Sequence, residues 1–207
     1  MTLPEIYQHF IEGIKATTWL EFVAVAFGIV SVLYSRKENI LVYPTGIINT
    51  VLYTWFCFGW WGLYAEGSLN FYYTVMSIYG WILWSRKKGG GTEKQLRITK
   101  STNKEWLFSL VFFVICYVVL YWVLSRYTRS TVPMADAFAS AAAYTGMLLM
   151  ARKKLENWLW WILTNLASIP LYFYKGAVFT SFQYVVFFVL AIMGYITWKK
   201  KIHAGTA

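Results

Sequence analysis

Seven long and mostly apolar stretches follow one another along the chain, and they limit the possible folds more than any other feature. A helix of about 20 apolar residues crosses the hydrocarbon core of a bilayer. The pattern therefore predicts an all-α integral membrane protein with seven transmembrane helices. We place the spans at 19–34, 40–58, 69–84, 106–124, 133–150, 158–174 and 178–198.

Composition supports this class. The chain is 58% hydrophobic and 14% charged, whereas soluble domains are about 25% charged. Its net charge of +10 is compatible with nucleic-acid binding, but the Lys and Arg residues form short runs between the apolar stretches. We therefore expect a lipid bilayer and no nucleic acid as partner. His9 and His203 lie near the chain ends, and Cys57 and Cys116 lack metal-ligand spacing, so we expect no metal and no cofactor.

The charge of the loops predicts the orientation. The loops on one side of the predicted membrane carry fifteen Lys and Arg residues and those on the other side carry four. Because cytoplasmic loops are the basic ones, we expect the N-terminus outside and the C-terminus, with the basic tail 199–207, in the cytoplasm. Residues 1–18 predict a short amphipathic helix on the membrane surface.

The two halves of the chain resemble each other. Asn49 and Asn165 hold similar places in spans 40–58 and 158–174, and the pattern of Gly80 and Trp84 returns at the end of span 178–198. These matches predict a duplication: a three-helix bundle at 19–84, a linker with a linker helix at 85–132, and a second bundle at 133–198. The two bundles would be parallel, in a 3+1+3 arrangement, with a solute site between them.

Polar and aromatic side chains recur at helical spacing inside four spans. Amides match hydroxyls and carboxamides, and Trp and Tyr faces stack on flat rings and attract cations. The pattern predicts a site for a flat, neutral or cationic ring that carries a sugar. Asn, Ser and Thr also hold membrane helices together, and Trp gathers at interfaces. The candidate residues are Thr45, Asn49, Asn70, Tyr73, Trp81, Trp84, Trp158, Trp161, Asn165, Tyr172 and Gln183.

Charged groups are absent from the middle of the predicted spans. Proton-coupled carriers need a titratable group in the path, so we expect uncoupled transport. An enzyme would need a nucleophile, an acid–base pair or a metal cluster, and none is evident. A non-transporting membrane scaffold is the alternative outside the transporter class.

Four ordered segments carry a family resemblance: Tyr43 to Asn49, Tyr79 to Trp81 with Trp84, Glu156 to Trp158 with Trp161 and Asn165, and Ile169 to Gly176. They resemble the PnuC family of bacterial nicotinamide riboside transporters, relatives of the SWEET sugar carriers. The resemblance implies a SWEET-like fold in the bacterial inner membrane and facilitated diffusion of this vitamin B3 form, an NAD precursor. It also implies trapping by cytoplasmic phosphorylation and a homotrimer. Sister subfamilies that carry thiamine, riboflavin or deoxynucleosides stay open.

Overall fold

The computed structural model describes residues 3–16, 18–61, 64–85, 96–128 and 130–205. These residues form eight α-helices and one π-helical turn, and their only β-type pairing is a bridge between Thr99 and Lys154. Residues 86–95 of the predicted linker lie outside the described residues. The helices are α1 (Leu3–Ala16), α2 (Trp19–Arg36), α3 (Val42–Phe56), α4 (Tyr64–Ser85), α5 (Asn103–Tyr127), α6 (Pro133–Ala151), α7 (Asn157–Tyr174) and α8 (Val178–His203), with the π-helical turn η1 (Cys57–Trp61) after α3.

Each predicted span coincides with one helix, and the amphipathic N-terminal segment coincides with α1. The predicted span 40–58 differs in one respect. Its α-helix ends at Phe56, and the π-helical turn η1 follows it. By length and hydropathy, α5, α6 and α8 qualify as membrane-crossing helices, and 22–36 of α2 is a shorter apolar helix. The all-helical membrane class is thereby confirmed.

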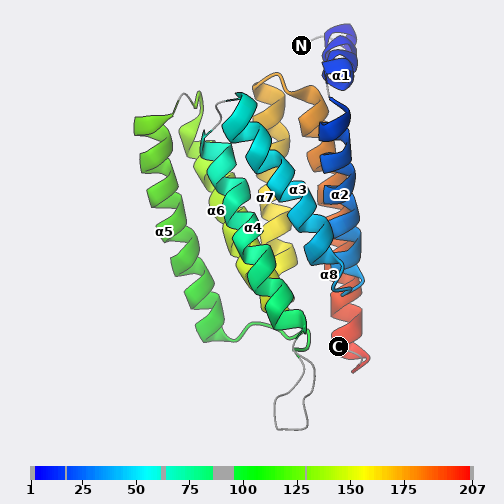
Figure 1. Cartoon of the computed structure of the whole chain (residues 1–207). Coiled ribbons are helices and arrows are strands. Elements are labelled where there is room, and N and C mark those ends of the chain that lie inside the picture. Colours follow the sequence, from blue (N-terminus) through cyan, green and yellow to red (C-terminus); the bar gives the residue numbers. More distant parts are fainter. Residues whose placement is uncertain (1–2, 17, 62–63, 86–95, 129, 206–207) are drawn as a thin grey trace.

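The helices pack in a closed order (Figure 1). Helices α2, α3 and α4 pack in sequence, as do α6, α7 and α8, while α2 contacts α8 and α4 contacts α6. Helix α5 contacts α6 at the edge of the bundle, and α1 contacts α8 near the N-terminal end. The N-terminus and the C-terminus lie at opposite ends of the bundle.

Small side chains make α6 the central helix of its half. Ala137, Ala141 and Ala142 are fully buried, because alanine lets neighbouring backbones approach closely. Helix α5 packs mainly against α6, with Phe113 also touching Trp160 of α7, and it leaves apolar side chains such as Val114 and Val118 half exposed. That exposure suits a helix whose outer face meets lipid.

The loops α2–α3 and α6–α7 have the same backbone conformation. Glu38 and Lys153 both have positive φ angles, 60° and 51°, which non-glycine residues adopt rarely. The N–H of Glu38 donates to Ser35 and the N–H of Lys153 donates to Met150, both at 2.9 Å. Each pair of corresponding positions is separated by 115 residues. The shared geometry agrees with the duplication that the sequence predicts.

Candidate functional site

Aromatic rings from three helices meet where α4 of the first half faces α6 and α7 of the second. The ring centre of Tyr73 lies 6.2 Å from that of Tyr144 and 6.2 Å from that of Trp161. Tyr72 packs on Tyr144 at 4.1 Å and donates its hydroxyl hydrogen to the Tyr144 carbonyl oxygen at 3.3 Å. Gly146, two residues after Tyr144 on α6, leaves space for Trp161, since a methyl group there would lie 3.3 Å from the indole. We call Tyr72, Tyr73, Tyr144 and Trp161 the central cluster.

Asn165 lies one turn beyond Trp161 on α7. Its side chain is only 4% exposed, and among the described residues no hydrogen-bond partner reaches its amide. Its amide atoms are not among the fully enclosed atoms that lack a partner in the described residues, so the amide remains accessible and can both donate and accept hydrogen bonds. A solute that offers a hydroxyl or a carboxamide would supply the missing bonds, which makes Asn165 the best placed of the predicted polar ligands.

The face of α7 that bears Asn165 continues to Tyr172. The Tyr172 ring stacks on Tyr184 of α8 at 5.0 Å and 17°. Gln183, next to Tyr184, is half buried. Tyr172 therefore extends the aromatic lining toward the end of the bundle opposite to the Glu38 and Lys153 loops.

Asn49 has a different environment from its counterpart Asn165. Its amide nitrogen donates to the Ala24 carbonyl oxygen at 2.7 Å and joins α3 to α2 inside the first half. Thr45, one turn earlier, donates its hydroxyl hydrogen to the Leu41 carbonyl oxygen of its own helix at 2.6 Å. Asn70 is half buried on α4, where its backbone carbonyl oxygen accepts a hydrogen bond from the Thr74 hydroxyl. These bonds favour the packing interpretation for Asn49 and Thr45.

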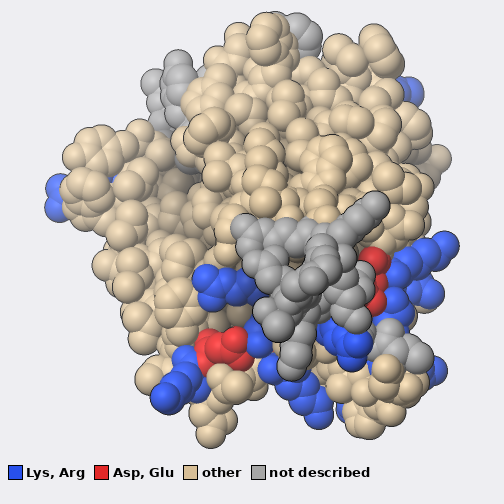
Figure 2. All heavy atoms as spheres, turned by 60° about the horizontal axis from the view of Figure 1, so that its bottom comes forward, with Lys and Arg blue, Asp and Glu red and all other residues tan. Residues whose placement is uncertain are grey.

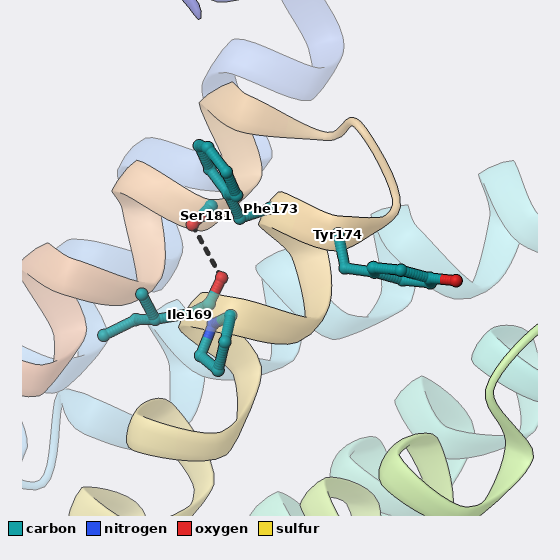
Figure 3. A pocket seen from close by; sticks show the side chains of 5 residues that line it. Ile169, Phe173, Tyr174 and Ser181 are labelled. Atoms are coloured by element: carbon teal, nitrogen blue, oxygen red, sulfur yellow. Dashed lines mark hydrogen bonds between the residues drawn. The ribbon is translucent and has the colours of Figure 1, made fainter. Parts of the chain in front are cut away.

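A surface pocket of about 370 Å³ lies at the C-terminal end of α7 (Figure 3). Ile169, Pro170, Phe173, Tyr174 and Ser181 line it, and the Ser181 hydroxyl donates to the Ile169 carbonyl oxygen at 2.8 Å. Tyr174 is 74% exposed, so the pocket opens outward. It contains none of the predicted ligands.

Comparison with known proteins identifies the family. The profile of the family described as Nicotinamide mononucleotide transporter matches residues 18–200. The chain belongs to this transporter family.

Curated relatives cover most of the chain. The nicotinamide riboside transporter PnuC of Escherichia coli is 26% identical and aligns with 87% of this chain and 85% of its own length. The PnuC of Neisseria mucosa is 27% identical over 91% of this chain and 75% of its own length. The riboflavin/roseoflavin transporter RibM of Streptomyces davaonensis is 23% identical over 87% and 84%.

The fold is also that of a solved family structure. The crystal structure of the vitamin B3 transporter PnuC superposes with a TM-score of 0.74 at 24% identity, covering 98% of this chain and 90% of the other. The helix order described above is therefore the order expected for a member of this transporter family.

Three tryptophans that the sequence predicts to bind solute do not belong to the central cluster: Trp81, Trp84 and Trp158. Trp84 is 9% exposed and donates its indole N–H to the Ala151 carbonyl oxygen at 3.2 Å. Trp158 is 2% exposed and packs edge-on against Trp198 at 5.6 Å. Both lie near the Glu38 and Lys153 loops, while Trp81 is 40% exposed. The structure thus brings Tyr73 and Trp161 together, with Asn165 one turn beyond Trp161 on α7, and leaves these three tryptophans outside the central cluster.

Tyr144 is the residue of the central cluster that sequence reasoning missed, together with its neighbour Tyr72. Tyr144 is the single large polar ring in a helix composed mostly of Ala, Met and Gly. An isolated Tyr on a small-residue helix was the available signal, because such a helix packs closely and any large ring on it must occupy an interior space.

Proposed function

We propose that this chain carries nicotinamide riboside across the bacterial inner membrane by facilitated diffusion. Membership of the transporter family supports the transport function. The observation that carries the choice of solute is the cluster of the Tyr73, Tyr144 and Trp161 rings. The Asn165 amide, which has no hydrogen bond to the described residues, lies one turn beyond Trp161 on α7.

The chemistry of the solute fits this surface. Nicotinamide riboside consists of a cationic pyridinium ring with a carboxamide and a ribose with free hydroxyls. Aromatic faces attract such a cation, more strongly where water is excluded. The Asn165 amide both donates and accepts, so it can pair with the carboxamide or with a ribose hydroxyl.

The same surroundings favour the riboside over the mononucleotide named in the family description. A phosphate group requires Lys, Arg or a helix N-terminus. In the part of the chain that the structure describes, the Lys and Arg residues lie at the helix ends and in the loops, and the central cluster contains only neutral side chains. A buried phosphate would have no cationic partner there.

Riboflavin is the second candidate, because the curated relative RibM is a riboflavin/roseoflavin transporter. Its flat ring and ribityl hydroxyls would also suit Tyr, Trp and Asn side chains. Its ring is neutral and larger than a pyridinium ring. Cation attraction and size are therefore the properties that separate the two solutes.

We further propose that the seven helices α2 to α8 each cross the membrane in a SWEET-like 3+1+3 arrangement. The bundles comprise residues 19–84 and 133–198, and 85–132 links them. The matched loops at Glu38 and Lys153 support the duplication. Lys and Arg residues gather at one end of the molecule (Figure 2), which supports a cytoplasmic C-terminus and an outer N-terminus. We call this the basic end; α2, α6 and α8 end there.

The resemblance to the PnuC family supports two further proposals, namely a homotrimer and trapping of the imported riboside by cytoplasmic phosphorylation. A carrier without ion coupling only equilibrates its solute, so a consuming step is needed for accumulation. The family and its curated relatives are described as transporters, and we assign the chain no enzymatic activity.

Ligand binding to the purified protein tests the proposed function. In a thermal-shift and calorimetry series, nicotinamide riboside should raise the melting temperature, whereas the mononucleotide and thiamine should not. In proteoliposomes, riboside uptake should stop at equal concentrations and should not respond to a proton or sodium gradient. Binding of riboflavin but not of the riboside would replace the first candidate with the second. Absence of binding for all four would refute the proposal.

A further inference from the structure

Corresponding positions of the two repeats touch each other at the basic end. The Lys153 ammonium donates to the Glu38 carboxylate at 2.7 Å, and these positions are separated by 115 residues. The Ser35 hydroxyl donates to the Met150 sulfur at 3.3 Å across the same separation. Two corresponding residues can meet only beside the axis that relates the halves. The contacts therefore lie on the line along which a solute between the halves would leave.

Two tryptophans also join the two halves at the basic end, and we call this contact region between the halves the junction. Trp84, at the end of α4, donates to the carbonyl oxygen of Ala151 at the end of α6, at 3.2 Å. Trp198, near the end of α8, donates to the carbonyl oxygen of Ser35 near the end of α2, at 3.0 Å. The last helix of each half thus bonds to the first helix of the other half. Opening the junction would break both bonds together.

Three charged side chains close the junction. The Glu38 carboxylate pairs with Lys153 at 2.7 Å and with Lys201 of α8 at 2.9 Å. Lys153 is 7% exposed, and its ammonium lies 4.5 Å from the centre of the Trp84 ring. Burial alone would raise the pKa of Glu38, but the bonds and charges of the two lysines outweigh it and hold that pKa below its usual value. The carboxylate is therefore ionised at neutral pH.

The other ion pairs do not join the two halves. Lys154 pairs with Glu105 at the start of α5, and Lys175 pairs with Asp136 within the second half. Among the ion pairs between described residues, only those of Glu38 connect α2 and its loop to helices of the second half. Charged groups suit a reversible contact, because water can solvate them when they separate.

We infer that Glu38, Lys153 and Lys201 form the gate through which the solute leaves at the basic end. This inference rests on the proposed transport function. The pairs are closed in the present structure, and the central cluster lies farther from the basic end, on α4, α6 and α7. Breaking the pairs favours the conformation that is open toward the basic end, and the solute-binding residues stay unchanged.

Thiol labelling measures the opening of this gate directly. Ser77 is 3% exposed and lies on α4 between Tyr73 and Trp84, so Ser77→Cys places a buried thiol at a depth between the central cluster and the gate. The variant is made with Cys57→Ala and Cys116→Ala, and inside-out vesicles are treated with a membrane-impermeant maleimide. Glu38→Gln should raise the labelling rate roughly tenfold, while riboside affinity stays within about twofold.

Glu105→Gln is the matched control. It removes a carboxylate that pairs with a lysine at the same 2.7 Å and at the same end of the molecule, but not between the halves. The labelling rate should not change. An equal rise in Glu105→Gln would overturn the gate, because it would show general loosening of this end.

Unchanged labelling in folded Glu38→Gln would also overturn the gate. If Glu38→Gln does not fold, Lys201→Met serves instead, because it keeps the buried Lys153 pair and removes the half-exposed one. It should raise labelling roughly threefold, and no rise would overturn the gate. The maleimide reaction reports opening of the gate whether or not a solute is bound. Faster labelling in a protein that does not bind the riboside would support the gate and refute the proposed solute.

Discussion

Truncating Asn165 and its counterpart Asn49 should have opposite consequences. In the structure Asn165 is 4% exposed and has no hydrogen-bond partner among the described residues, whereas Asn49 donates to the Ala24 carbonyl oxygen at 2.7 Å. Asn165→Ala removes a group that only a solute can satisfy. Asn49→Ala removes a bond between α2 and α3.

The expected magnitudes follow from these contacts. Loss of one or two hydrogen bonds to a bound solute costs about 1–3 kcal/mol, which is roughly a 5- to 150-fold loss of affinity. Asn165→Ala should not lower the melting temperature, since no internal bond is lost. Asn49→Ala should cost about 0.5–1 kcal/mol of stability and leave the affinity within about twofold.

Isothermal titration with nicotinamide riboside and thermal unfolding of both variants, in one detergent, separate these effects. The reasoning is refuted if Asn165→Ala binds as tightly as the unchanged protein. Equal loss of affinity in the two variants would refute it too, because it would make the two repeats equivalent at the site.

Three other changes test separate parts of the structure. Tyr144→Leu removes the ring that contacts Tyr72 and Tyr73, so it should weaken riboside binding roughly tenfold in calorimetry, while Tyr144→Phe keeps most of the affinity. Gly194→Ala places a methyl group 2.5 Å from the Trp158 ring and should cost about 1–3 kcal/mol in thermal unfolding; Gly59→Ala, whose methyl group meets nothing within 4 Å, is the control. The lowered pKa of Glu38 means that its carboxylate stabilises the folded protein above the usual value of 4.5, and this contribution is lost as the pH falls through the lower folded pKa. The difference in melting temperature between the unchanged protein and Glu38→Gln should therefore shrink below pH 4.5, and a difference constant with pH would contradict the assignment.

The sequence alone determined the class of the protein and the position of its helices. Apolar length and the placement of Lys and Arg are local properties, and each predicted span coincides with a helix. The sequence also predicts a repeat, because the motifs at Asn49 and Trp84 return at Asn165 and Trp198. The family resemblance stood on these same segments, and the family profile confirmed it.

Only the tertiary structure decided which residues of each face meet in the interior. Asn49 and Asn165 are indistinguishable in the sequence, yet one joins two helices and the other is unpartnered. Tyr144 entered the central cluster because α6 lies beside α4 and α7. The physical reason is that helical periodicity fixes which side chains share a face. The direction that the face takes depends on how each helix is rotated against its neighbours, and that rotation is set by packing between residues far apart in the chain.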